Sequence, residues 1–160
     1  MKGRVISSTG NWYEVEVDAK QVFACKVKGN FRLKGMKTTN PVAVGDWVEI
    51  EHHAKISSGN GMPGGWISSI GERKNCIIRK SVNLSKQTHI IAANIDTAFL
   101  VTGLTQPRTP QGFLDRFLVT AEAYRVPVCI VFNKSDLFDA GIQSEYEEYC
   151  RIYQNIGYPV

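Results

Sequence analysis

The sequence contains no apolar run of membrane-spanning length, and no signal peptide opens it. Its four cysteines include no C-x-x-C pair, so their spacing predicts neither a disulfide framework nor a zinc site. Acidic residues are absent from one long basic stretch, since six cations and no acid occur from Lys20 to Lys37. These absences lead us to expect a cytoplasmic protein with reduced, structural cysteines and no membrane partner.

The remaining composition is that of a globular protein of 160 residues, 43% hydrophobic and 21% charged. This length suits one ordinary domain or two small ones. The net charge of +4 conceals an asymmetry, because residues 1–92 carry 14 Lys and Arg against 7 Asp and Glu, whereas residues 93–160 carry 5 against 8. We expect the two parts to do different things, and the first is the better candidate for a polyanionic partner.

Residues 2–70 show short stretches of alternating apolar and polar residues that are separated by turn-forming residues. The predicted strands are Gly3–Ser7, Trp12–Val17, Val22–Val27, Asp46–Glu51 and Gly65–Ile70. Five short strands at this spacing predict an all-β, five-stranded barrel. An OB-like barrel, the oligonucleotide- and oligosaccharide-binding fold, is the first choice, and an SH3-like barrel is the alternative.

The connection between the third and fourth of these strands is long, contains glycine and is basic. Cations that contact phosphates and aromatic rings that stack on bases are the ingredients of RNA binding on such a barrel, and Phe23 and Phe31 lie among these cations. The alternative is a solvated loop beside a core phenylalanine. The predicted RNA-binding residues are Lys26, Lys28, Arg32, Lys34 and Lys37.

The second part of the chain alternates strand and helix patterns, which favours a parallel sheet with right-handed crossovers. A strand is predicted over Thr97–Thr102. Thr109 is predicted as the N-cap of the following helix, with Pro110 at its first position. Ser144 and Glu147 have the spacing of a capping box and predict the start of a second helix.

A second apolar run, Val128–Phe132, ends directly in Asn133-Lys134-Ser135-Asp136. Because the run is apolar on both faces, we predict a buried parallel strand, whose carboxyl end is where open α/β sheets bind ligands. Asn-Lys-x-Asp in that position is the guanine-reading motif of GTPases. The carboxylate of Asp136 could accept from both the N1–H and the exocyclic NH2 of guanine.

The other residues of this motif suit the same task. The aliphatic stem of Lys134 could cover the base while its ammonium stays in water. Asn133 could tie the loop together or meet the O6/N7 side of the base. The alternative is a chance tetrapeptide, since Asn, Ser and Asp are ordinary loop residues after a strand.

Guanine recognition alone does not make a GTPase, which also needs a phosphate loop, G-x-x-x-x-G-K-[ST], and a magnesium ligand. The sequence contains neither this phosphate loop nor a D-x-x-G segment. In ordinary GTPases the phosphate loop precedes Asn-Lys-x-Asp, but here a predicted barrel stands in its place. We therefore expect a fragment of a longer protein in which the GTPase motifs are circularly permuted.

The order of these features resembles the ribosome-small-subunit-dependent GTPase A family, called RsgA or YjeQ. The resemblance extends over essentially the whole chain, and its strong signal is the arrangement of three features after the barrel. They are Ala92–Asp96, the helix with Leu114–Leu118 and Ala121-Glu122, and Phe132–Leu137. It implies a cytoplasmic GTPase that binds the small ribosomal subunit and its rRNA and acts late in its assembly. It further implies GTP and GDP as ligands at Asn133–Asp136, and Mg²⁺ and structural Zn²⁺ in a C-terminal part outside this sequence.

From these observations we predict three segments: an OB-fold RNA- and ribosome-binding domain over 1–72, a basic linker over 73–89, and the first part of a circularly permuted P-loop GTPase domain over 90–160. We assign no catalytic or metal-ligating residue, expect a monomer, and predict that these 160 residues alone do not hydrolyse GTP. Two alternatives stay open. One is an OB-fold RNA-binding module with a non-enzymatic α/β domain, and the other is an α/β interaction protein.

Overall fold

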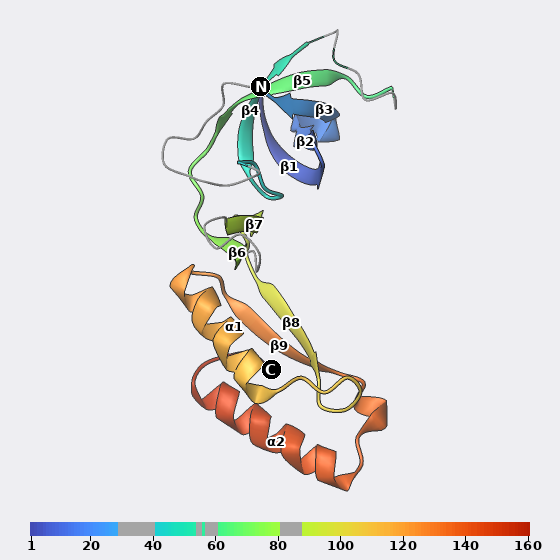
Figure 1. The fold of residues 1–160 in the computed structure, drawn as a ribbon, viewed down its shortest axis with the longest axis vertical. Coiled ribbons are helices and arrows are strands. Elements are labelled where there is room, and N and C mark those ends of the chain that lie inside the picture. Colours follow the sequence, from blue (N-terminus) through green and yellow to red (C-terminus); the bar gives the residue numbers. More distant parts are fainter. Residues whose placement is uncertain (29–40, 54–55, 57–60, 81–87) are drawn as a thin grey trace. The chain divides into compact units, whose positions relative to one another are not determined.

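The computed structural model describes residues 1–28, 41–53, 56, 61–80 and 88–160. They form two compact units, Met1–Ile95 and Asp96–Val160, which are described separately (Figure 1). None of the described helices is both long enough and apolar enough to cross a membrane. The predicted RNA-binding residues Arg32, Lys34 and Lys37 lie outside the described residues.

Five strands of the first unit form a closed barrel in the order β1-β2-β3-β5-β4. The strands are β1 (Lys2–Thr9), β2 (Trp12–Val17), β3 (Val22–Val27), β4 (Trp47–His52) and β5 (Gly64–Ile70), with a 3-10 turn at Asp18–Lys20. β3 pairs with β5 in parallel, while β1 pairs with both β2 and β4 and so closes the barrel. This strand order is that of an OB fold, and the predicted barrel and its five strands are confirmed.

The barrel interior is filled by the apolar residues that alternate along each strand. Val15, Cys25 and Ile67 are completely buried, and Val5 and Ile50 are only 1% and 2% exposed. The residues between them point outward, as the twofold period of a strand requires. Burying this continuous apolar cluster is the main stabilising contribution that the barrel strands make.

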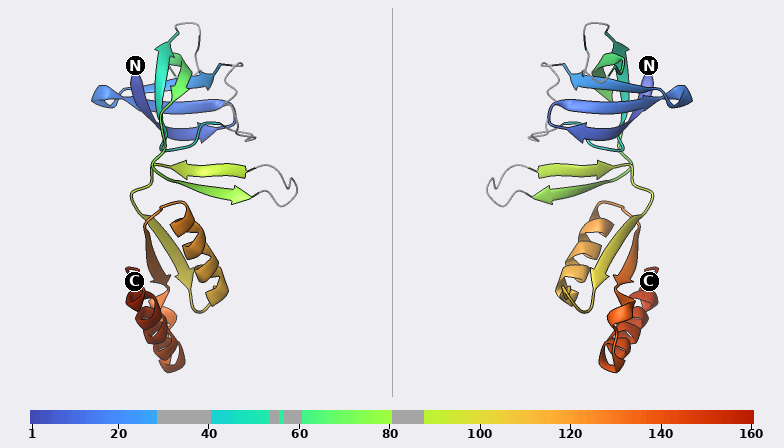
Figure 2. Two further views of the ribbon diagram at one scale, coloured as in Figure 1. Left: turned by 90° about the vertical axis from the view of Figure 1, so that its left-hand side faces the viewer. Right: turned by 90° about the vertical axis from the view of Figure 1, so that its right-hand side faces the viewer.

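A two-stranded hairpin follows the barrel, with β6 at Cys76–Lys80 and β7 at Thr88–Ala93 (Figure 2). The sequence pattern predicts a linker over 73–89 and no strand before residue 89, so this hairpin is a correction. The pairing shifts register between Ile77 and Ile78, and such a bulge breaks the alternation by which a strand is recognised. The hairpin is attached to the barrel by a bridge between Val44 and Ala92.

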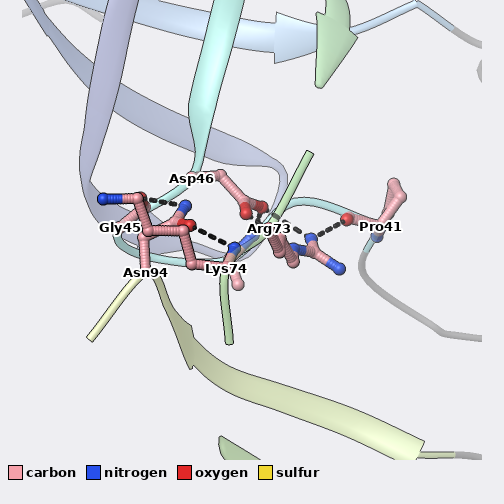
Figure 3. A network of polar contacts seen from close by, with 7 residues as sticks. Pro41, Gly45, Asp46, Arg73, Lys74 and Asn94 are labelled. Atoms are coloured by element: carbon pink, nitrogen blue, oxygen red, sulfur yellow. Dashed lines mark hydrogen bonds and ion pairs between the residues drawn. The ribbon is translucent and has the colours of Figure 1, made fainter. Parts of the chain in front are cut away.

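A buried ion pair ties the start of this hairpin segment to the barrel (Figure 3). Asp46 is fully buried, and its carboxylate accepts from Nε and Nη2 of Arg73, each at 2.6 Å. The same carboxylate accepts from the Ala43 amide at 2.8 Å, and Arg73 Nη2 also donates to the Pro41 carbonyl at 2.8 Å. The hydrogen bonds to Asp46 raise the pKa of Arg73, so its guanidinium stays protonated.

Asn94 ties the end of the hairpin to the same part of the barrel (Figure 3). Its side-chain oxygen accepts from the Lys74 amide at 2.9 Å, and its amide nitrogen donates to the Gly45 carbonyl at 3.0 Å. Its φ is +53°, a left-handed conformation that asparagine tolerates better than most residues. Asn75 also bonds both the amide and the carbonyl of Ile95. Asn94 of the Ala92–Asp96 segment therefore has a structural role, because it holds the end of the hairpin against the barrel.

The second unit is a β-α-β-α arrangement, as predicted. It contains β8 (Ala98–Gly103), α1 (Gln111–Ala123), β9 (Val128–Asn133), a 3-10 turn at Ser135–Leu137 and α2 (Ala140–Asn155). β8 and β9 pair in parallel, with Ala98 opposite Val128 and Gly103 opposite Asn133. Pro159 then accepts a hydrogen bond from the Ile130 amide at 2.8 Å, so the residues after α2 approach β9 as a further strand would.

Only one face of this two-stranded sheet is buried, which corrects the prediction of a strand buried on both sides. Leu100 and Ile130 are 7% and 1% exposed, whereas Phe99, Val101 and Val131 on the other face are 66%, 60% and 36% exposed. Phe132 packs against Tyr146 and Tyr149 of α2, on the buried face. Within the described residues, no helix covers the face that carries Phe99.

Both predicted helix starts are wrong in detail. Pro110, with an extended backbone, is the N-cap of α1, while the Thr109 hydroxyl accepts from the Gly103 amide at 3.3 Å. Asp139 is the N-cap of α2, since its side chain accepts from the Ile142 amide at 2.9 Å. Ser144 lies in the second turn of the helix and is not part of a capping box.

Candidate functional site

The carboxyl ends of β8 and β9 lie at one edge of the parallel pair, where Gly103 is opposite Asn133. This is the edge at which open α/β sheets bind ligands. The Asn-Lys-Ser-Asp segment leaves β9 there, and the segment 104–109 leaves β8 there. The register therefore brings two loops together that are far apart in the sequence.

The loop after β9 is fixed by its own hydrogen bonds. The Asn133 side-chain oxygen accepts from the Lys134 amide at 2.8 Å, and the Lys134 carbonyl accepts from the Leu137 amide at 3.0 Å. Lys134 has φ of +64°, so the chain turns sharply there into the 3-10 turn at Ser135–Leu137. Of the two roles predicted for Asn133, the structure shows its side-chain oxygen tying the loop together.

The charged side chains of this loop have different surroundings. The Lys134 ammonium donates to the Gln106 carbonyl, which belongs to the loop after β8. Asp136 is exposed, and its carboxylate makes no hydrogen bond or ion pair with the residues that the structure describes. An exposed carboxylate beside a fixed turn retains both oxygens for accepting hydrogen bonds from a ligand.

A cavity of about 190 Å³ lies between the two loops. Its lining consists of Val101, Thr102, Gly103, Pro107, Thr109, Asn133 and Lys134. It is smaller than the roughly 300–1,000 Å³ of a complete ligand pocket, so it suits part of a ligand. The Thr102 hydroxyl is buried and has no hydrogen-bond partner among the described residues. Sequence reasoning found Asn133 and Lys134, but it missed the five residues that come from the loop and strand across the cavity.

Two of the predicted RNA-binding residues lie on the barrel. Lys26 of β3 places its ammonium 4.3 Å from the centre of the Trp12 ring. Lys28 forms an exposed ion pair with Glu51, with Nζ and Oε2 2.6 Å apart. The two cations therefore differ, because Lys26 makes no ion pair with a described residue and Lys28 already has one.

A specific hydrogen bond connects the two helices of the second unit. The Tyr153 hydroxyl of α2 donates to the Asp115 carboxylate of α1 at 2.9 Å. Burial and this hydrogen bond raise the pKa of Tyr153 above its ordinary value. The neighbouring Leu114 is completely buried. The Leu-Asp-Arg segment thus supports the helices behind the site and does not line the cavity.

Comparisons with known proteins agree with this architecture. A family model described as RsgA GTPase matches residues 70–160, and one described as RsgA N-terminal domain matches residues 2–60. The chain is 52% identical over 159 residues to a Small ribosomal subunit biogenesis GTPase RsgA of Bacteroides fragilis and 51% identical to one of Bacteroides thetaiotaomicron. These alignments cover 99% of the chain and 49% of each relative, so the chain spans about half the length of the curated relatives it matches.

Two solved structures have a similar fold at 30% sequence identity. One is YloQ, a circularly permuted GTPase, with a TM-score of 0.69 over 99% of this chain and 50% of that one. The other is YjeQ from Thermotoga maritima, with a TM-score of 0.70 over 99% of this chain and 49% of that one. Both matches include the barrel and the β-α-β-α segment in one alignment.

Proposed function

Because the chain belongs to the RsgA GTPase family, we propose that the whole protein is a cytoplasmic, monomeric GTPase that binds the small ribosomal subunit and acts late in its assembly. Within this chain, Asn133, Lys134, Ser135 and Asp136 bind the guanine nucleotide. The observation that carries the proposal is the position of this loop, at the carboxyl end of β9 and beside the cavity between the two loops.

The chemistry of the loop favours guanine. The two carboxylate oxygens of Asp136 have no partner among the described residues, and they match the adjacent N1–H and NH2 donors of guanine but not the edge of adenine. The bond from Lys134 to the Gln106 carbonyl holds the lysine stem over the cavity rim, where it can cover the face of a base. Asn133 fixes the turn and thereby the direction of Asp136.

The other parts of the function are assigned by segment. We propose residues 1–72 as the RNA-binding domain, 73–89 as the connecting segment and 90–160 as the first part of the GTPase domain. Lys26, Lys28, Arg32, Lys34 and Lys37 then contact rRNA phosphates. The sequence has no phosphate loop, so the residues present fit the base and not the phosphates or Mg²⁺. Phosphate, Mg²⁺ and structural Zn²⁺ binding are assigned to the part of the relatives that this chain does not cover.

The test is nucleotide binding by the full-length protein that contains this chain, with Asp136→Asn as the variant. Xanthine carries a carbonyl where guanine has its exocyclic NH2, so an amide at position 136 can donate to it. We expect GDP affinity to fall by about 10- to 100-fold, as for the loss of hydrogen bonds to a charged group, and XDP affinity to rise. Titration with both nucleotides measures the change.

Asp139→Asn is the matched control, because it removes the same charge three residues away. Asparagine caps helices as well as aspartate does, so α2 should remain intact in this control and GDP binding unchanged. An equal loss in both variants would refute a specific role of Asp136. If the unmodified protein bound no GDP, the RNA-binding module with a non-enzymatic α/β domain would be the better account.

A further inference from the structure

All three tryptophans of the chain lie at outward-facing positions of the barrel, namely Trp12, Trp47 and Trp66. Their chain neighbours Tyr13, Val48 and Ile67 fill the core and are at most 3% exposed. Trp47 is exposed and Trp12 and Trp66 are partly buried, and tryptophan at a surface is enriched in binding sites. The placement of these rings therefore needs an explanation other than core packing.

Two of the tryptophans belong to one row that crosses the barrel strands. Lys26 of β3 is directly opposite Trp66 of β5, and on its other side it places its ammonium 4.3 Å from the Trp12 ring of β2. Directly opposite residues in a sheet point to the same face. Trp12, Lys26 and Trp66, called the Trp-Lys-Trp row below, thus form a ring–cation–ring sequence on the outer face. Trp12 and Lys26 lie on β2 and β3, the strands whose face binds oligonucleotides in OB folds.

The charges around the Trp-Lys-Trp row leave its cation available. Glu51 of β4, opposite Trp66, is the nearest acid along the row. Its ion pair with Lys28 lowers the pKa of its carboxyl, so this charge is already compensated. Lys26 makes no ion pair with a described residue. Glu14 is the next outward residue after Trp12 on β2, so an anionic ligand is expected to cross the strands and not to run along β2.

We propose that the Trp-Lys-Trp row binds single-stranded RNA, with an unpaired base stacked on each ring and the phosphate between them on Lys26. The two rings lie on β2 and β5, two inter-strand spacings apart, which corresponds to about 10 Å. This distance is roughly three times the rise between stacked bases, so one base cannot contact both rings and each ring stacks on its own base. Stacking on indole suits any base, while the lysine adds a salt-dependent contact. This inference rests on the proposed function and adds a stacking site to the phosphate contacts proposed there.

The test uses the full-length protein and a fluorescent single-stranded oligouridylate, with an abasic oligonucleotide of the same length as second ligand. We expect the native protein to prefer the ligand that has bases. Trp12→Ala and Trp66→Ala should each weaken oligouridylate binding by about 5- to 100-fold and leave binding of the abasic ligand nearly unchanged. Lys26→Gln should weaken both ligands and reduce the slope of log affinity against log salt by about one.

Trp47→Ala is the matched control, because Trp47 also faces outward and lies near two cations, Lys2 and Arg4. Trp47 is 43% exposed, more than the partly buried Trp12 and Trp66, and on β4 it lies four residues from Glu51, the residue opposite Trp66. Its oligouridylate affinity should stay within about twofold of the native value. Trp12→Phe keeps a ring and should recover most of the affinity, which a merely structural effect of the alanine variant would not predict. Thermal unfolding of each variant checks that the barrel is intact.

The proposal is overturned if the native protein binds both ligands equally, or if Trp47→Ala loses as much affinity as the row variants. Normal oligouridylate binding by both row variants would also overturn it and would leave a protein partner as the occupant of the row. Sedimentation of the unmodified protein with small ribosomal subunits distinguishes failure of the proposed function from failure of the stacking site. Failure there refutes the proposed function, whereas normal sedimentation with unaffected row variants refutes only the stacking site.

Discussion

At the scale of single residues, Cys25 reflects the packing of the barrel core. It is completely buried on β3, and the lack of water around it raises the pKa of its thiol from 9.0 to about 11. The folded barrel therefore keeps this proton at pH values at which the unfolded chain has lost it. Stability that depends on the neutral thiol is fully present below pH 9 and is lost as the pH rises towards 11.

The raised pKa of Cys25 predicts how the stability of the barrel depends on pH. Between pH 9 and 11 the native protein should lose about 2–3 kcal/mol more unfolding free energy than Cys25→Ala, since one pKa unit corresponds to about 1.4 kcal/mol. Urea unfolding at several pH values, followed by tryptophan fluorescence, measures both slopes. Identical slopes in the two proteins would contradict the assignment. Cys25 should also react with iodoacetamide more slowly than it does in urea.

Residue types alone predicted only part of the candidate site. Asn133, Lys134 and Asp136 could be found because one short motif contains all of them after an apolar strand. Thr102 and the Gln106 carbonyl could not be found, because their proximity to Lys134 depends on the register that places Gly103 opposite Asn133. Register in a parallel pair is set by the packing of the whole β-α-β unit and has no local sequence signal.

At the scale of elements, the start of α2 can be tested by comparing its N-cap, Asp139, with Ser144, the position that the sequence pattern suggested. Asp139 caps the helix, so Asp139→Ala should lower the unfolding free energy of the second unit by about 1 kcal/mol. Ser144→Ala, at the position where the sequence pattern suggested the cap, should change it by less than half as much. Urea denaturation followed by far-ultraviolet circular dichroism would compare them. A larger loss of unfolding free energy in Ser144→Ala than in Asp139→Ala would show that Ser144 and not Asp139 caps the helix.

The elements that were predicted well are those in which apolar and polar residues alternate with a clear period. The barrel strands alternate, so Trp12–Val17 and Val22–Val27 were predicted with the bounds that the structure has. β6 was missed because the bulge between Ile77 and Ile78 places consecutive apolar residues in a short strand. The start of α2 was misplaced because Ser144 and Glu147 match a capping pattern by spacing alone, although Asp139 supplies the cap.

At the scale of the whole molecule, the two units divide the charge. The basic residues are concentrated in the part that contains the barrel, and the acidic excess is in the part with the guanine motif. This division agrees with the separate RNA and nucleotide contacts that we propose, because a polyanion such as RNA is attracted to the first part and not to the second. The buried Asp46–Arg73 pair and Asn94 belong to the barrel unit and fix where the chain leaves it.

The sequence lacks one element that GTP hydrolysis requires. The 160 residues contain no phosphate loop, so they should release no more phosphate from GTP than a protein-free control with Mg²⁺ does. A colorimetric phosphate assay with added small ribosomal subunits tests this, and the full-length protein serves as the positive control. Hydrolysis by the 160-residue chain above the background of the subunits would show that a phosphate-binding element was overlooked.

The closure of the barrel has a consequence for the way the chain folds as it is synthesised. Lys2 pairs with Glu49 and Ala24 pairs with Gly64, so both closing contacts join segments that are far apart in the sequence. A ribosome that has released only β1, β2 and β3 has produced a meander with two unpaired edges, which invite association with other chains. β4 can pair with β1 once it has emerged, but closure becomes possible only after Ile70 has emerged and β5 can pair with both β3 and β4. This last step joins distant segments and is expected to be slow.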